Sequence, residues 1–156
     1  MLSRLGASVL VLAAGALAAC EAPQQASNGA LVFQVANESG QATQPKALKG
    51  EMEVGQRLEV RLGANAGTGF SWQMAGPAPA VMSLQSTDPA GVVAPVAGEA
   101  GRPGGGTVTT FAMTAIAQGE AQLRFVLARP WEKGVAPARV VDVAITVKPR
   151  SAPETR

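Results

Sequence analysis

Five segments of this chain alternate between apolar and polar residues, and few folds accept such a pattern. In the first segment, Leu58, Val60 and Leu62 share one face, and charged residues occupy the other face. Because side chains of a β-strand point alternately to its two faces, this period of two predicts half-buried strands. The five segments span residues 57–62, 70–74, 110–115, 120–127 and 141–148.

Weaker strand candidates lie at residues 31–35, 81–85 and 92–96, and no segment after the N-terminal leader shows a helical period. The 18 glycines and 11 prolines favour short strands that are joined by frequent turns. We therefore predict an all-β domain over residues 30–148. Its expected form is an immunoglobulin-like antiparallel sandwich of about seven or eight strands.

The first part of the chain, residues 1–19, has the features of a secretory signal peptide. Arg4 supplies a positive charge, and an uncharged apolar run extends from Leu5 to Leu17. This run is shorter than the roughly 20 residues that a membrane-spanning helix needs. The sequence Leu17-Ala18-Ala19-Cys20 resembles a lipobox, in which the cysteine thiol accepts the lipid. The alternative is an ordinary signal peptide with an incidental cysteine.

Cys20 is the only cysteine of the chain, so no intramolecular disulfide can form. Lipidation explains an unpaired cysteine in an exported protein, and it predicts a membrane anchor. Residues 20–29 are then the lipidated N-terminus and a flexible tether, and residues 149–156 are a disordered tail. Glu21 stands where an Asp would resemble an inner-membrane retention signal. We therefore expect a location in the cell envelope, at the outer membrane and facing the periplasm.

The chain has no histidine, which excludes Ser-His-Asp and Cys-His catalysis and removes the usual zinc ligands. A hydrolase that uses two carboxylates is the remaining enzyme class, and Glu51 and Glu53 are the closest pair. These residues flank a turn, so we interpret them as solvated edge charges. The 13 basic residues form no cluster, so no nucleic-acid partner is expected. We expect no enzymatic activity, no cofactor, no metal and a monomer.

The order of the predicted strands indicates which loops lie together. In an antiparallel chain, successive connections fall at opposite ends of the sandwich. The loops at residues 63–69, 97–106 and 128–139 should therefore share one end. This prediction assumes that residues 81–85 do not form a separate strand that crosses the whole sandwich.

Three motifs occupy these loops, namely Asn65-Ala-Gly-Thr-Gly-Phe-Ser-Trp72, Gly104-Gly-Gly-Thr107 and Arg129-Pro-Trp-Glu132. In this order they resemble motifs of the chagasin family, whose members are proteinaceous inhibitors of papain-like cysteine peptidases. The resemblance covers roughly Leu31 to Lys148. Two departures stand out: Ala66 and Gly67 replace the family's usual Pro-Thr, and Pro103 stands where the first glycine of the second motif belongs.

The resemblance implies a reversible, noncovalent inhibitor whose three loops block the active-site cleft of a papain-like cysteine peptidase. The first loop would enter the cleft beside the catalytic cysteine, and the other two loops would cover its sides. The implied contact residues are Asn65, Ala66, Gly67, Thr68, Gly69, Phe70, Gly104, Gly105, Gly106, Arg129, Pro130 and Trp131. The departure at Ala66 and Gly67 keeps an alternative open, an envelope-anchored binding module of the same fold without a peptidase target.

The two tryptophans should occupy different environments. Trp72 alternates with polar neighbours on a predicted strand, as does Phe70, so we expect both in the core. Trp131 lies in a polar loop outside any alternating segment, where a rigid indole is a good interface anchor. The alternative is that Trp131 folds back over the edge of the sandwich, with Arg129 stacked on it.

Overall fold

The structure is a computed structural model that describes residues 24–25, 29–37, 44–65, 67–85, 91–98, 100 and 104–151. The predicted signal peptide, Cys20 and Ala66 lie outside these residues. Across the described ranges, no helix is long and apolar enough to cross a membrane. All regular elements in these ranges are strands, as the alternating sequence predicts.

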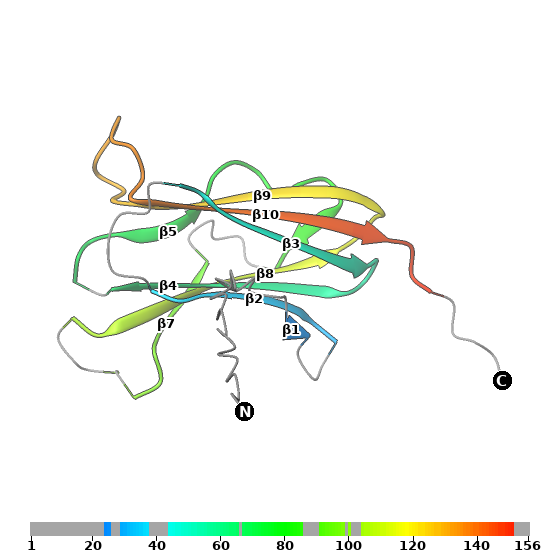
Figure 1. Ribbon diagram of the computed structural model, residues 1–156, viewed down its shortest axis with the longest axis horizontal. Coiled ribbons are helices and arrows are strands. Elements are labelled where there is room, and N and C mark those ends of the chain that lie inside the picture. The colour runs from blue at the N-terminus through cyan, green and yellow to red at the C-terminus, as the bar shows by residue number, and fades with distance from the viewer. Residues whose placement is uncertain are drawn as a thin grey trace, which may run out of the picture.

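The strands are β1 (Gln24–Gln25), β2 (Leu31–Val35), β3 (Lys46–Glu53), β4 (Arg57–Asn65), β5 (Ser71–Met74), β6 (Met82–Leu84), β7 (Val92–Pro95), β8 (Gly106–Ala115), β9 (Gly119–Ala128) and β10 (Arg139–Lys148). They form two sheets that pack face to face (Figure 1). The first sheet has the order β1-β2-β4-β8-β6, with β7 also paired to β8. The second has the order β3-β10-β9-β5. The predicted all-β sandwich is confirmed.

The core lies between the two sheets and is built from the inward positions of the alternating segments. Leu58, Val60 and Leu62 of β4 are fully buried. Phe111 of β8 meets Phe125 of β9 across the sandwich, with ring centroids 4.7 Å apart and ring planes inclined at 43°. This tilted arrangement of aromatic rings joins the centres of the two sheets.

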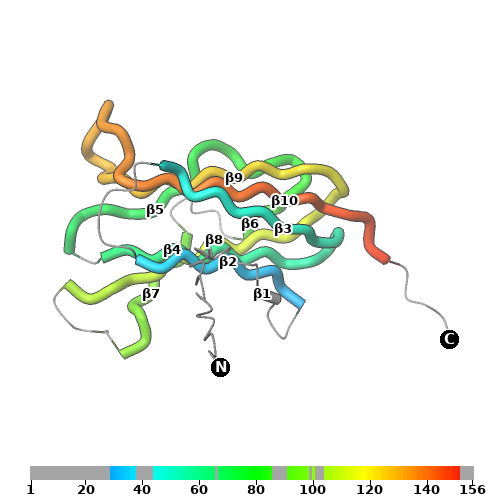
Figure 2. Tube along the Cα trace, viewed as in Figure 1, coloured from blue at the N-terminus to red at the C-terminus, as the bar shows by residue number. Residues whose placement is uncertain are grey.

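Two strand pairs are parallel, which refines the antiparallel expectation. β2 pairs in parallel with β4, and β3 pairs in parallel with β10. The chain changes sheet between β2 and β3 and again between β3 and β4, as the trace in Figure 2 shows. These two reversals return β4 to the direction of β2. Alternation reports which face of a strand is buried, but it carries no information on the direction of the neighbouring strand.

β6 and β7 both pair antiparallel with β8, at opposite parts of its length. β6 pairs with residues 113–115, and β7 pairs with residues 107–110. The two short strands therefore run in the same direction along one edge, and β6 adds no reversal of the chain. The assumption that residues 81–85 form no separate crossing strand is correct.

Trp72 of β5 belongs to this core, with none of its surface exposed. Its indole Nε1 donates a hydrogen bond to the Gly63 carbonyl oxygen at 2.9 Å. The hydrogen bond satisfies the one polar group of the buried ring. The predicted core position of Trp72 is confirmed.

Candidate functional site

Three connections meet at one end of the sandwich, and we number them in chain order. The first loop is residues 66–70, the second is 96–105 and the third is 129–138. Asn65 pairs with Gly106, which places the end of β4 beside the start of β8. Ser71 pairs with Ala128, which places the start of β5 beside the end of β9. The described parts of all three connections lie at the left in Figure 1, at the end that chain order predicts.

The first loop crosses from one sheet to the other and is shaped by two glycines. Gly67 and Gly69 have φ angles of +85° and +75°, in the left-handed region that favours glycine. Thr68 Oγ1 donates a hydrogen bond to the Asn65 carbonyl oxygen at 2.9 Å and closes the turn. The Asn65 side-chain oxygen accepts a further hydrogen bond from Asn37 Nδ2. The loop is therefore held at its base, while Gly67 and Thr68 are exposed.

The Arg129 side chain connects the third loop to the first. Its Nε donates to the Thr68 carbonyl oxygen at 3.1 Å, and its Nη1 pairs with Glu132 Oε1 at 3.0 Å. The guanidinium lies over the ring of Phe70, 4.4 Å from the ring centroid. The alternative in which Arg129 stacks on the Trp131 indole is wrong in that contact, because Arg129 stacks on Phe70. Phe70 precedes β5 and is half-buried at the margin of the core.

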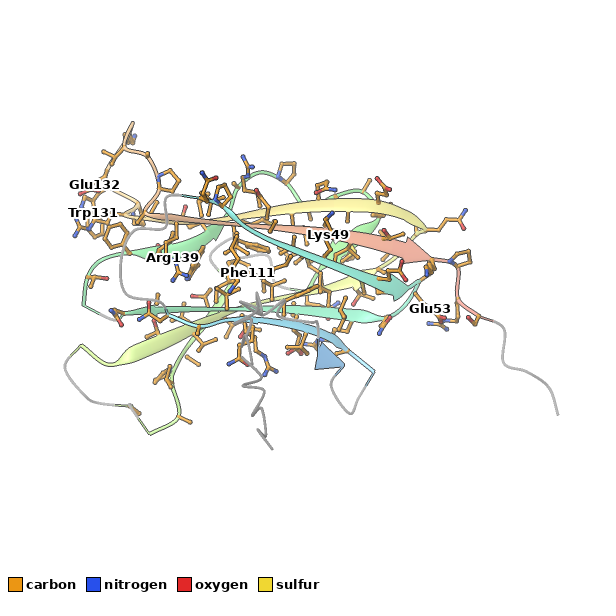
Figure 3. The ribbon with its side chains drawn as sticks, in the orientation of Figure 1. Lys49, Glu53, Phe111, Trp131, Glu132 and Arg139 are labelled. Atoms are coloured by element: carbon orange, nitrogen blue, oxygen red, sulfur yellow. The ribbon has the colours of Figure 1, made fainter. Side chains whose placement is uncertain are left out.

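Trp131 is 66% exposed, and its indole rests on the first loop. A Cβ atom built on Gly69 would lie 2.9 Å from Trp131 Cζ2 and closer still to Cη2. No residue with a side chain fits at position 69 unless the indole moves. Trp131 is therefore supported along one edge, and most of its surface faces solvent at the end of the molecule (Figure 3). Pro130 beside it is exposed as well.

The second loop carries two of the three predicted glycines. Gly104 has a φ of +74° and no atom within 4 Å of the place where a Cβ would stand. Gly105 is half-buried, and Gly106 belongs to β8, where its carbonyl oxygen accepts a hydrogen bond from Val96 N at 2.9 Å. Gly106 therefore takes part in the backbone hydrogen bonding of the sheet and also marks the end of the loop. The neighbouring residues 101–103 lie outside the described ranges.

Val135 of the third loop is a candidate contact residue that the motifs do not include. It is 62% exposed and lines a small pocket of about 160 Å³ together with Phe70, Arg129 and Glu132. In the described ranges, five large apolar side chains are strongly exposed: Val92, Val93, Ile116, Trp131 and Val135. Two of them, Trp131 and Val135, share the third loop. The sequence signal for Val135 is a large apolar residue that stands outside any alternating segment, as Trp131 does.

Glu51 and Glu53, the closest pair of carboxylates in the sequence, line one open pocket, but each is engaged by a neighbouring side chain. Glu51 pairs with Lys148 Nζ at 2.5 Å, and Glu53 accepts a hydrogen bond from Ser151 Oγ at 2.7 Å. Glu53 lies at the end of the sandwich opposite Glu132 (Figure 3), and Glu51 precedes it by two residues on β3. Within the described ranges, no group of three or more potential ligands is arranged to hold a metal ion.

Comparisons with known proteins give one family. Residues 51–145, more than half of the chain, match the family described as "Chagasin family peptidase inhibitor I42". No curated protein matches the sequence.

Two solved structures share the fold. The cysteine protease inhibitor EhICP2 from Entamoeba histolytica is 17% identical with a TM-score of 0.55, and the alignment covers 75% of this chain and 96% of that one. PbICP-C, solved in complex with falcipain-2, is 18% identical with a TM-score of 0.52, covering 75% and 98% of the two chains. At these identities the likeness concerns the fold.

Proposed function

This chain belongs to the chagasin family of peptidase inhibitors, and we propose that it is a reversible, noncovalent inhibitor of papain-like cysteine peptidases. Family membership assigns it to inhibitors and not to enzymes. The observation that carries the proposal is the exposed Trp131 indole, supported on the backbone of Gly69. A rigid aromatic group held at the edge of a loop cluster is the type of residue that anchors interfaces.

The proposed mechanism is steric exclusion of substrate. Gly67 has open space around it and no side chain, so the backbone of the first loop can approach the catalytic cysteine closely. Trp131 would lie against one wall of the cleft, and the second loop, with Gly104 at its end, would lie against the other. Inhibition of this kind needs no catalytic group of the inhibitor, which agrees with a chain that has no histidine.

The names of the structural neighbours support the same partner. One neighbour is described as a cysteine protease inhibitor, and the other was solved in complex with falcipain-2. Both cover most of the sandwich domain. We infer by extension that the loops of this chain bind a peptidase of the same mechanistic class.

The test is an inhibition titration with a soluble form that starts at residue 20 and carries Cys20→Ser. We expect reversible, competitive inhibition of papain, with the inhibitor recovered intact by mass spectrometry. Trp131→Ala should weaken inhibition about thirtyfold, or about 2 kcal/mol, as for an interface anchor. Absence of inhibition of several papain-like enzymes at micromolar inhibitor would instead favour the binding module without a peptidase target.

We further propose that Cys20 is lipidated and anchors the domain in the cell envelope, at the periplasmic face of the outer membrane. Gln56 Nε2 donates a hydrogen bond to the Gly29 carbonyl oxygen at 2.7 Å, so the chain enters the domain at the end opposite the three loops. An anchor attached there would leave the loops accessible to a peptidase. Detergent-phase partitioning that persists after Cys20→Ser, or mass spectrometry showing an unmodified Cys20, would refute the proposal.

A further inference from the structure

We propose that Arg129 is a positioning residue, which locks the first and third loops into one rigid unit instead of contacting the peptidase itself. The inference rests on the proposed inhibitory function and changes the role that the Arg-Pro-Trp motif implies for its arginine. It follows from what the guanidinium already binds within the inhibitor.

The interactions of Arg129 occupy both an edge and a face of the guanidinium. A guanidinium is planar and carries five N–H donors in a fixed arrangement. One donor binds the Thr68 carbonyl oxygen at 3.1 Å, and another binds Glu132 Oε1 at 3.0 Å. The ring of Phe70 covers one face at 4.4 Å. Two of the five donors and one face of Arg129 are thus engaged within the inhibitor, although the side chain is 36% exposed.

The two side-chain bonds of Arg129 are made to residues that are adjacent in sequence to Gly69 and to Trp131, which contact each other. Thr68, which accepts the first bond, directly precedes Gly69 in the first loop. Glu132, which forms the ion pair, directly follows Trp131 in the third loop, and its backbone N–H also donates to the Arg129 carbonyl oxygen at 3.0 Å. Arg129 therefore holds the residue next to each partner of the contact, and both loops are fixed relative to one another.

This rigid connection between the first and third loops gives a physical reason for tight binding. Two separate loops would each lose conformational freedom when they order at the interface, and this loss weakens association. If the loops are already joined in the free inhibitor, most of that freedom is lost during folding. Trp131 then meets the peptidase in its binding orientation.

The test is a double-mutant cycle between Arg129→Ala and Trp131→Ala, measured as inhibition constants for papain. We expect each single variant to weaken inhibition, Trp131→Ala about thirtyfold and Arg129→Ala roughly tenfold. If Arg129 acts through Trp131, the loss in the double variant should be far smaller than the product of the two single losses. Additive effects, close to three-hundredfold, would overturn the proposal and make Arg129 an independent contact residue.

The matched control is Arg124→Ala. Arg124 lies on β9, the strand that leads into the third loop, and like Arg129 it forms an ion pair, with Asp142 at 2.7 Å, but it points outward from the second sheet. This variant removes an arginine and an ion pair without touching the loops. We expect unchanged inhibition.

Hydrogen exchange of the free protein provides a measurement that does not require a peptidase. Arg129→Ala should accelerate exchange at the amides of residues 67–70 in the first loop, and Arg124→Ala should not. Glu132→Gln, which removes the charge of one partner, should give an intermediate acceleration. Unchanged exchange in the first loop of Arg129→Ala would contradict the proposal that Arg129 joins the two loops. This result does not depend on inhibition of any peptidase, so the positioning role and the inhibitory function can be refuted separately.

Discussion

The two tryptophans differ in environment, and the pattern of residues around each one predicts the difference. Trp72 stands in an alternating segment and is fully buried, whereas Trp131 stands outside such a segment and is 66% exposed. Periodicity distinguishes these environments because it reports on the face of a strand. It does not report on contacts between loops, so neither the packing of Trp131 on Gly69 nor the stacking of Arg129 on Phe70 could be predicted.

Trp72→Ala should destabilise the domain by about 3–5 kcal/mol, because it leaves a large cavity and removes the hydrogen bond to the Gly63 carbonyl oxygen. The free energy of unfolding in urea measures this loss. Trp131→Ala is the control and should change stability little. A Trp72→Ala protein with an unchanged transition midpoint would show that the ring is not part of the core.

Gly69→Ala and Gly67→Ala separate two roles of glycine in the first loop. Both residues have positive φ angles, so alanine at either position strains the backbone by about 1–2 kcal/mol. Only the Cβ at position 69 collides with Trp131, since nothing lies within 4 Å of position 67. Gly69→Ala should therefore shift the indole N–H resonance of Trp131 in the NMR spectrum. An equal shift in Gly67→Ala would argue against the contact.

Strand β3 shows where prediction of elements from alternation fails. Its buried positions include Leu48 and Met52, and the inward position between them is Gly50. A Cβ on Gly50 would lie 2.8 Å from Phe33 Cζ, because the Phe33 ring of β2 fills the space of the missing side chain. The glycine conceals the period of two, although the strand is regular. The strongly alternating strands, by contrast, are found close to their predicted bounds.

The third loop allows the most direct test of whether an exposed apolar side chain contacts the peptidase. Val135 on this loop and Ile116 at the opposite end are similarly exposed, at 62% and 56%. Val135→Asp should weaken inhibition by roughly tenfold or more, because a charge would be desolvated at the interface. Ile116→Asp should leave inhibition unchanged. Equal effects of the two variants would show that Val135 lies outside the contact surface.

At the scale of the whole molecule, the sandwich holds three loops at one end and the chain termini of the domain at the other. The first loop joins the two sheets, the second belongs to one sheet and the third to the other. At the far end, Arg150 Nε donates to the Val54 carbonyl oxygen at 3.1 Å, so the predicted tail is held there through Ser151. Chain order alone predicts the clustering of the loops, because β6 adds no reversal.

The central claim is that these loops occupy the active-site cleft of a papain-like peptidase. The most direct measurement is the rate at which iodoacetamide alkylates the catalytic cysteine of papain as the Cys20→Ser inhibitor is added. The inhibitor itself then has no thiol, because Cys20 is its only cysteine. We predict that the alkylation rate falls in proportion to added inhibitor until the two proteins are equimolar. An unchanged rate at saturating inhibitor would contradict the claim.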